Sequence, residues 1–139
     1  SRGLGDVYKR QEILSRYGLV KQLLNESVDQ YLYMADQTGT LWENLTPTAS
    51  CNHGFAAHIA HVFYRDLLGL AKIDPIHKRL NIVFNDSDLK QCSGTVPVGD
   101  EEISLSWEKK GKRLYYTLDT PAGYEISIEN KTALKPIAQ

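Results

Sequence analysis

The sequence predicts an α-then-β chain, in which helices come first and a small antiparallel β-sandwich follows. Apolar residues recur every three or four positions between residues 13 and 34, as on the buried face of a helix. From about residue 74 apolar and polar residues alternate, as in strands with one buried face. The 139 residues are 42% hydrophobic and 24% charged, which is typical of a globular protein. We therefore place a domain boundary between residues 73 and 74.

The first helical run is divided in two by a glycine. Gly18 interrupts the pattern, Ser27 is a good N-cap for a second helix, and Gly39 is placed to end it. The expected buried stripe consists of Ile13, Leu14, Tyr17, Val20, Leu23, Leu24, Val28, Tyr31, Leu32 and Met34.

A third helix is expected after the polar loop ENLTPTAS. Ser50 or Asn52 can cap its first turn, and Gly69 is placed to stop it. Its apolar stripe consists of Phe55, Ile59, Val62, Phe63 and Leu67. Helices with such stripes need partners, so the helical half is too small to stand alone.

The strands of the second half are expected to be short and antiparallel. The turns KKGK and TPAGY carry the glycine and proline that tight reversals need. The residues expected on buried strand faces are Ile103, Leu105, Trp107, Leu114, Tyr116, Leu118, Tyr124, Ile126 and Ile128.

Charge and hydropathy exclude two classes of partner. Sixteen basic and 17 acidic residues are spread along the chain and give a net charge of −1, with no basic stripe for a nucleic acid. No apolar run approaches the roughly 20 residues needed to cross a bilayer. Cys51 and Cys92 form no CxxC pair, which favours buried thiols over a disulfide framework.

The strongest candidates for chemistry flank the loop before the third helix. Glu43 directly follows Trp42, and an indole beside a carboxylate can wall a sugar site and raise the pKa of the acid. Asn52 and His53 offer hydrogen-bond donors and acceptors to ligand hydroxyls. From residue types alone, a packed tryptophan, a solvated glutamate and a helix-capping asparagine remain the more common alternatives.

A zinc site is the weaker interpretation of the same region. His58 and His61 lie three apart, and Cys51 and His53 are near in sequence. His53 and His58 are five apart, however, which turns them away from each other on a helix, and no H-E-x-x-H motif occurs. We therefore predict no metal and no cofactor.

The order and spacing of these residues resemble a known family. GTLWEN followed by SCNHGFAAHIAHVFYRDLLGL is similar to the end of the catalytic domain of bacterial α-L-rhamnosidases, the glycoside hydrolases of family 78. There a T-[LI]-W-E element precedes S-x-N-H and a helix with a Tyr-Arg pair. The matching residues are Thr40, Leu41, Trp42, Glu43, Ser50, Asn52, His53, Tyr64, Arg65 and Gly69.

The resemblance implies a C-terminal fragment of such an enzyme. Residues 12–73 would be the last helices of an (α/α)6 six-hairpin barrel, and residues 74–139 the C-terminal β-sandwich. The substrate would be a carbohydrate with terminal α-L-rhamnose, hydrolysed by an inverting two-carboxylate mechanism. Glu43 would be the general base, Trp42 would line the sugar pocket, and Asn52 and His53 would contact sugar hydroxyls.

Several expectations qualify this resemblance. Gly54 stands where the family usually has an aromatic residue, which bears on pocket shape and sugar preference. The Asp-rich element with the general acid does not occur in this chain, so we expect the polypeptide alone to be inactive. Residues 1–11 resemble a translated sequencing adapter and are expected to be a non-native leader.

Another (α/α)6 glycosidase or phosphorylase, and a non-catalytic carbohydrate-binding module, remain alternatives. The compartment stays open: periplasmic or extracellular if the protein is exported, otherwise cytoplasmic.

Overall fold

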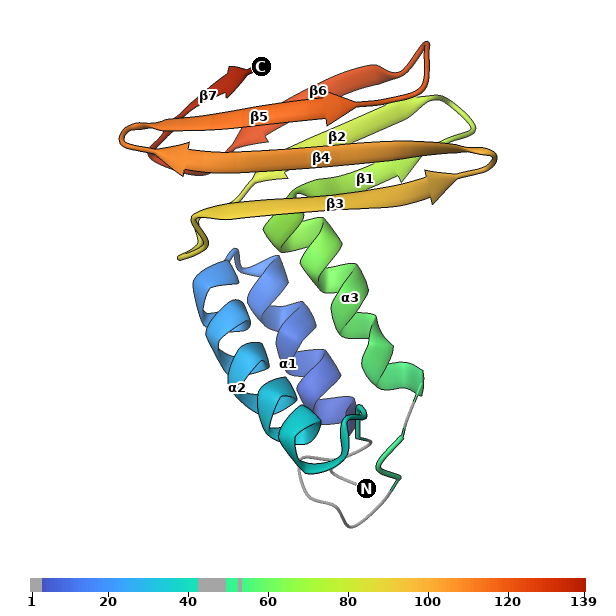
Figure 1. Ribbon diagram of the computed structural model, residues 1–139, viewed down its shortest axis with the longest axis vertical. Coiled ribbons are helices and arrows are strands. Elements are labelled where there is room, and N and C mark those ends of the chain that lie inside the picture. Colours follow the sequence, from blue (N-terminus) through green and yellow to red (C-terminus); the bar gives the residue numbers. More distant parts are fainter. Residues whose placement is uncertain (1–3, 43–49, 53) are drawn as a thin grey trace. The chain divides into compact units, whose positions relative to one another are not determined.

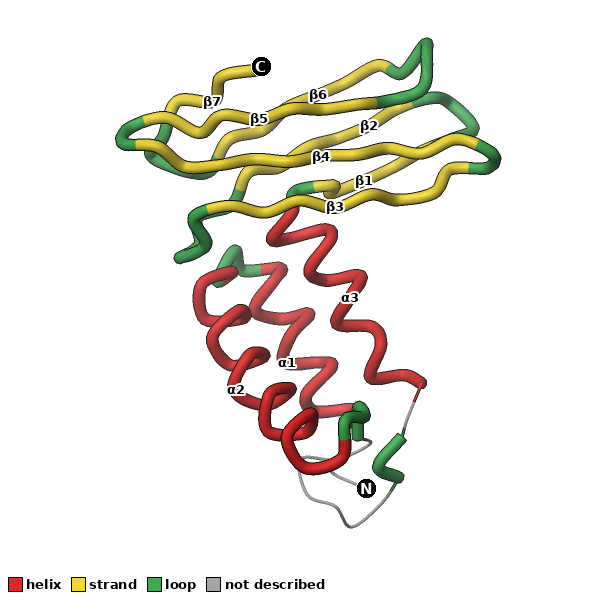
Figure 2. Tube along the Cα trace, viewed as in Figure 1, coloured by secondary structure: helices red, strands yellow, loops and turns green. Residues whose placement is uncertain are grey.

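The computed structural model describes residues 4–42, 50–52 and 54–139 (Figures 1 and 2). The chain divides into two compact units, Ser1–Phe63 and Tyr64–Gln139. We call them the helical unit and the sandwich unit. The division lies ten residues before the expected boundary at 73/74, because the residues between them pack into the sandwich.

Within the described residues the helical unit has four helical segments. These are α1 (Leu4–Arg16), α2 (Val20–Thr38), the 3₁₀ turn η1 (Gly54–Ala57) and α3 (His58–Val62). Gly18, at φ 69°, separates α1 from α2, as the sequence predicts. Gly39 ends α2 in the left-handed conformation and donates its backbone N–H to the Ala35 carbonyl.

The α1 and α2 helices pack through a small apolar core. Leu14, Leu23, Ile59 and Val62 are buried together, with Tyr31 and Phe63 packed against them. None of the helices in the described part of the chain is long and apolar enough to span a bilayer.

Two expectations for the helical unit require correction. Ser27 is not an N-cap: it lies inside α2, is buried, and its hydroxyl accepts a hydrogen bond of 3.3 Å from the Gln11 side chain. The helix begins seven residues earlier because the glycine break already frees the chain to start it at Val20. In addition, four residues of the expected buried stripe are exposed, because they lie away from the small core of the unit: Ile13, Tyr17, Val28 and Leu32, at 53%, 79%, 38% and 58%.

The sandwich unit consists of seven strands in two sheets (Figure 1). A three-stranded sheet has the order β1-β2-β6 and a four-stranded sheet the order β3-β4-β5-β7. The strands are β1 (Leu70–Asp74), β2 (Arg79–Phe84), β3 (Gln91–Val98), β4 (Glu101–Lys110), β5 (Arg113–Asp119), β6 (Glu125–Asn130) and β7 (Lys135–Ala138). The turn after β4 contains Gly111 at φ 61° and the turn after β5 contains Gly123 at φ 87°.

The expectation of a purely antiparallel sandwich was only partly right. The pairs β1–β2, β3–β4 and β4–β5 are antiparallel, whereas β2–β6 and β5–β7 are parallel. After β5 the chain crosses to the other sheet and pairs alongside β2, and β7 then returns beside β5. Alternation along a strand reveals which face is buried, but it carries no information about strand direction.

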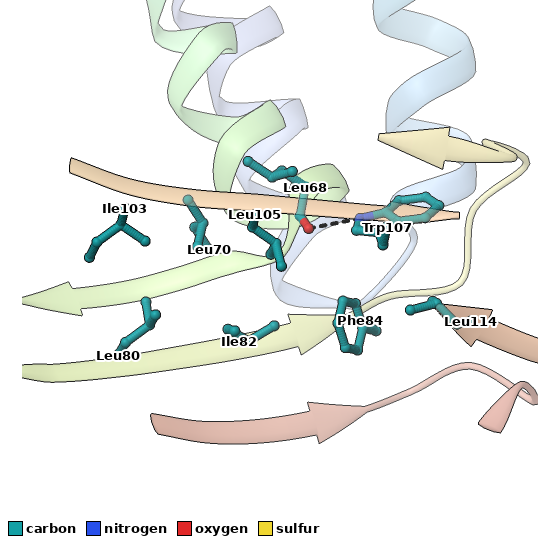
Figure 3. Packing of buried hydrophobic residues seen from close by; sticks show 9 residues of the cluster. All are labelled: Leu68, Leu70, Leu80, Ile82, Phe84, Ile103, Leu105, Trp107 and Leu114. Atoms are coloured by element: carbon teal, nitrogen blue, oxygen red, sulfur yellow. Dashed lines mark hydrogen bonds between the residues drawn. The ribbon is translucent and has the colours of Figure 1, made fainter. Parts of the chain in front are cut away.

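The core of the sandwich lies between the two sheets (Figure 3). In the middle of β4 every second residue is buried, namely Ile103, Leu105 and Trp107, as the alternation predicts. Burying a side chain of this size stabilises the fold by about 1.5–3 kcal/mol relative to leaving it exposed. Ile126 and Ile128 differ from the expectation: each is 42% exposed, because β6 is an edge strand with one neighbour.

A π-helical turn, η2 (Phe63–Leu68), leads into β1 and is held by the sandwich from Tyr64 onward. The Trp107 indole N–H donates a 2.9 Å hydrogen bond to the Leu68 carbonyl, drawn in Figure 3. The Asn85 side chain donates a 2.9 Å hydrogen bond to the Asp66 carbonyl. These contacts satisfy carbonyls at the end of a helix, which otherwise lack partners.

Candidate functional site

The candidate site lies at the end of α2, where the chain reverses after Gly39. Trp42 folds back onto the helix and is buried, with 2% of its surface exposed. Its backbone N–H points at the Met34 sulfur at 3.5 Å, and its ring meets the Tyr33 ring edge-on at 5.7 Å between centroids. The indole is therefore a packed anchor, the arrangement that residue types alone favour.

A chain of hydrogen bonds continues from this indole. The Trp42 Nε1–H donates to the Thr38 hydroxyl oxygen at 2.6 Å, and the Thr38 and Thr40 hydroxyl oxygens are 2.7 Å apart. The Thr40 hydroxyl donates in turn to the Cys51 carbonyl oxygen. These hydrogen bonds thus connect Trp42 to Cys51 through the two threonine hydroxyls.

The donors available limit the directions of these hydrogen bonds. A hydroxyl has one proton, and that of Thr40 goes to the Cys51 carbonyl, which can only accept. The single proton of the Thr38 hydroxyl has two acceptors within reach, the Thr40 hydroxyl oxygen at 2.7 Å and the Met34 carbonyl oxygen at 3.4 Å. Thr38 in turn accepts from the indole, which can only donate.

The other predicted site residues fall on both sides of this chain. Glu43 and His53 lie outside the described residues. Asn52 is exposed and follows a turn in which its backbone N–H points at the Ser50 hydroxyl oxygen, 3.4 Å away, while that hydroxyl donates to the Asn52 carbonyl at 3.0 Å. Of the four predicted site residues, Trp42 and Asn52 are thus placed by the structure.

The histidines considered for zinc make other contacts. His58 Nε2 is 3.0 Å from a carboxylate oxygen of Glu12, and the His58 and His61 rings are 5.5 Å apart between centroids. In the described ranges no three metal-ligating side chains gather. Cys51 and Cys92 are both half-buried, and burial raises the pKa of the Cys92 thiol.

A hollow of about 440 Å³ lies on the outer face of the four-stranded sheet. Strand register places the hydroxyls of Ser93, Ser106 and Thr117 in one row across three strands. The neighbouring row consists of Gln91, Glu108 and Tyr115. The two rows therefore place polar side chains and the Tyr115 ring on the face of the sheet that is directed away from the core.

Comparison with known proteins gives one informative match. No protein-family model matches the sequence, and no curated protein matches it significantly. Among solved structures, a GH78 family rhamnosidase of Bacillus sp. GL1 matches with a TM-score of 0.78 and 20% sequence identity. The likeness is one of fold. The match covers 91% of this chain and 15% of that chain.

The match confirms the predicted resemblance to part of a GH78 enzyme at the level of the fold. It spans both units, helices followed by a sandwich, as the motifs TLWE and S-x-N-H indicated. Sequence reasoning missed Thr38, and it noted Thr40 only as a motif position. The available signal was the pair of hydroxyls flanking Gly39, the residue that reverses the chain.

Proposed function

We propose that this chain is the C-terminal part of a glycoside hydrolase that removes terminal α-L-rhamnose from glycans or glycosides. The observation that supports this proposal best is the fold match to a rhamnosidase across 91% of the chain. The T-L-W-E element at the reversal after α2 adds to it, because this is where the family resemblance locates the catalytic base.

Glu43 is the proposed general base. In an inverting mechanism one carboxylate activates a water molecule while a carboxylic acid on the opposite side of the sugar protonates the leaving oxygen, with about 6.5–9.5 Å between the two. The water attacks the anomeric carbon, the glycosidic bond breaks, and Glu43 takes the proton of the water. The acid would come from a segment upstream of this chain, within the rest of the (α/α)6 barrel.

Asn52 and His53 are the proposed contacts to sugar hydroxyls. Asn52 is exposed and can reach a ligand with both a donor and an acceptor. Trp42 is the proposed lining of the sugar pocket, and its ring packs against Tyr33.

The chain by itself is predicted to be inactive. Acid and base assistance each contribute about 10²–10⁴ to the rate, and only the base belongs to this chain. Incubation with an aryl α-L-rhamnoside should release no more aryl alcohol than the Glu43→Gln variant releases. Turnover that Glu43→Gln abolishes would contradict the prediction of inactivity.

The substrate class can be tested in a chimera. The matched segment of the Bacillus sp. GL1 rhamnosidase would be replaced by this chain, and folding checked by thermal melting against the parent enzyme. We expect hydrolysis of an aryl α-L-rhamnoside and at least tenfold slower hydrolysis of the α-L-fucoside, a difference of about 1.4 kcal/mol in barrier. A folded chimera that prefers the fucoside, or that requires phosphate, would favour another (α/α)6 enzyme instead.

A second candidate function is carbohydrate binding by the sandwich unit. The hollow of about 440 Å³ beside Tyr115 favours it, because hydroxyls and an aromatic ring suit a neutral sugar. Titration of the chain with rhamnose-containing oligosaccharides should then shift the amide signals of Ser93, Ser106 and Thr117. Saturable binding that Tyr115→Ala weakens and Glu43→Ala does not would support the binding module.

A further inference from the structure

The outer face of the three-stranded sheet carries a hollow of about 370 Å³ that the proposed function does not use. We call it the charged hollow, and the side chains that line it are those of Lys72, Asp74, Arg79, Asn81, Glu125 and Ser127. We propose that the charged hollow binds an acidic saccharide, a sugar that carries a carboxylate. The proposal needs neither Glu43 nor the hydrolysis of a rhamnoside, so it goes beyond the proposed function.

Strand register arranges these six side chains in two rows across β1, β2 and β6. The first row consists of Asp74, Arg79 and Glu125. The second row consists of Lys72, Asn81 and Ser127. Both rows lie on the outer face of the sheet, because the alternate residues of β2, Leu80 and Ile82, are buried in the sandwich core. The rows are about 7 Å apart, since each residue of a strand adds about 3.3 Å.

The two acidic residues of the first row already have partners in the protein. Asp74 Oδ1 accepts the backbone N–H of His77 at 3.0 Å, and Asp74 Oδ2 lies 2.9 Å from His77 Nδ1. Glu125 forms an ion pair with Arg79, at 3.4 Å from a carboxylate oxygen to Nε. The Arg79 guanidinium donates no hydrogen bond within the described part of the chain. Its terminal nitrogens can therefore donate to the oxygens of a ligand.

The second row supplies two further donor groups. Among the described residues, the Lys72 ammonium has neither a hydrogen-bond partner nor an ion-pair partner. The single proton of the Ser127 hydroxyl has two acceptors within reach, Asn81 Oδ1 at 3.1 Å and the Leu80 carbonyl oxygen at 3.5 Å. Neither contact uses the amide nitrogen of Asn81, which keeps two N–H donors for a ligand.

The positions and charges of these groups favour a carboxylate as the bound anion. Lys72 lies opposite Asn81, and Arg79 is two residues before Asn81, so the two cations are diagonal neighbours about 7–8 Å apart. An anion placed between them can contact both. The two carboxylates of the hollow balance these two cations. A ligand carboxylate adds one negative charge, whereas a phosphate adds about 1.5–2 and is repelled more strongly by Asp74 and Glu125.

The remaining groups of the charged hollow suit the hydroxyls of a sugar. The carboxylates of Asp74 and Glu125 can accept from ligand hydroxyls, and the Asn81 amide can donate to a hydroxyl oxygen. Neighbouring strands are about 4.8 Å apart, so the three strands span about 10 Å. A volume of about 370 Å³ is within the range of small-molecule sites. A ligand with one carboxylate beside several hydroxyls therefore fits the hollow, and this is the chemistry of an acidic saccharide.

The proposal can be tested by titrating the full chain with a trisaccharide of galacturonic acid. Two matched probes separate the features of this ligand. The methyl ester of the trisaccharide keeps the ring hydroxyls and loses the charge, whereas tricarballylate has three carboxylates and no sugar. Calorimetry would measure binding, and NMR would locate it through the amide signals of Asn81 and Ser127. The amide signals of Ser106 and Thr117, on the other sheet, serve as the reference.

Three variants with the same change in charge identify the cations that take part. Lys72→Gln and Arg79→Gln each remove one positive charge from the hollow, and Lys112→Gln removes one from the turn after β4. All three side chains are exposed, and thermal melting would check that each variant folds. We expect the first two variants to bind the acidic trisaccharide about three- to tenfold more weakly, because each loses one charged contact at an exposed site. Lys112→Gln should bind within about twofold of wild type.

The two probes should each bind at least about tenfold more weakly than the acidic trisaccharide. Equal binding of the methyl ester would overturn the role of the two cations, and equal binding of tricarballylate would overturn the saccharide. The absence of saturable binding, or shifts confined to Ser106 and Thr117, would overturn the charged hollow as the site. None of these results depends on Glu43, so rhamnoside hydrolysis keeps its own test in the chimera.

Discussion

At the scale of single residues, the clearest electrostatic feature is the ion pair between α1 and α2. Arg10 donates two hydrogen bonds, of 2.6 and 2.7 Å, to the Glu26 carboxylate, and Gln22 donates a third of 2.7 Å. The hydrogen bond from Arg10, followed by that from Gln22, lowers the pKa of Glu26 from 4.5 to about 2. Because the pKa is lowered on folding, the pair stabilises the folded state fully above the unfolded value and loses this effect as pH falls towards 2.

Replacing Arg10 should therefore have a pH-dependent effect. Arg10→Gln is expected to lower the melting temperature at pH 7, and the difference from wild type should shrink below about pH 5 and vanish near pH 2. Arg16→Gln removes the same charge from an exposed position of α1 and serves as the control. A melting difference for Arg10→Gln that stays constant down to pH 2 would show that Glu26 is not its source.

Residue-level prediction from sequence succeeded where local chemistry decides. Gly18 and Gly39 were placed correctly because a left-handed backbone is open to glycine at little cost. Ser27 was misplaced because a serine can cap a helix or bond inside one, and its choice depends on Gln11, sixteen residues earlier. The hydrogen bond from the Trp42 indole to Thr38 depends on the reversal of the chain after α2, which no local sequence pattern predicts.

At the scale of elements, the π-helical turn η2 and strand β3 fit each other at Gly94. A Cβ atom on Gly94 would lie 2.8 Å from a Leu68 methyl carbon and 3.0 Å from a Tyr64 ring carbon. Both distances are shorter than van der Waals contact. Gly94 thus admits the end of the helix against the sheet.

Gly94→Ala should accordingly destabilise the sandwich unit by about 1–3 kcal/mol, the usual cost of overpacking. Ser93→Ala, at the neighbouring exposed position of the same strand, should change stability by less than about 0.5 kcal/mol. Urea unfolding followed by tryptophan fluorescence would measure both. Equal stability of the two variants would contradict the close fit.

Element-level prediction was limited by what a periodic pattern contains. The buried faces of β4 and β5 follow from alternation, and Ile103, Leu105 and Leu114 are buried as expected. The parallel pairing of β6 and β7 was missed because pairing direction depends on how the chain crosses between sheets. Strand β7, four residues long, is too short to produce a pattern.

At the scale of the whole molecule, the boundary between the units has a testable consequence. The sandwich core includes Leu68 and Leu70, and the Leu68 carbonyl accepts the Trp107 indole hydrogen bond. A fragment of residues 64–139 should therefore melt cooperatively, whereas residues 74–139 should not, since they lack β1 and leave the indole without its acceptor. Near-ultraviolet circular dichroism would follow the melting of both fragments. Equal cooperativity would place the boundary near residue 73.

Several large apolar side chains of the helical unit are exposed. Ile13 on α1 and Leu32 on α2 are 53% and 58% exposed, and Tyr17, in the turn between these helices, is 79% exposed. The sequence indicated the apolar stripes of these helices, but it could not show which apolar residues are exposed in the described part of the chain.

The most direct test of the central claim is the rate of the chimera with Glu43→Gln. This change keeps the size of the side chain and removes its ability to accept a proton. If Glu43 is the general base, kcat for an aryl α-L-rhamnoside should fall about 10²–10⁴-fold while the melting temperature stays that of the parent chimera. A folded Glu43→Gln chimera that hydrolyses the rhamnoside at the parent rate would contradict the claim.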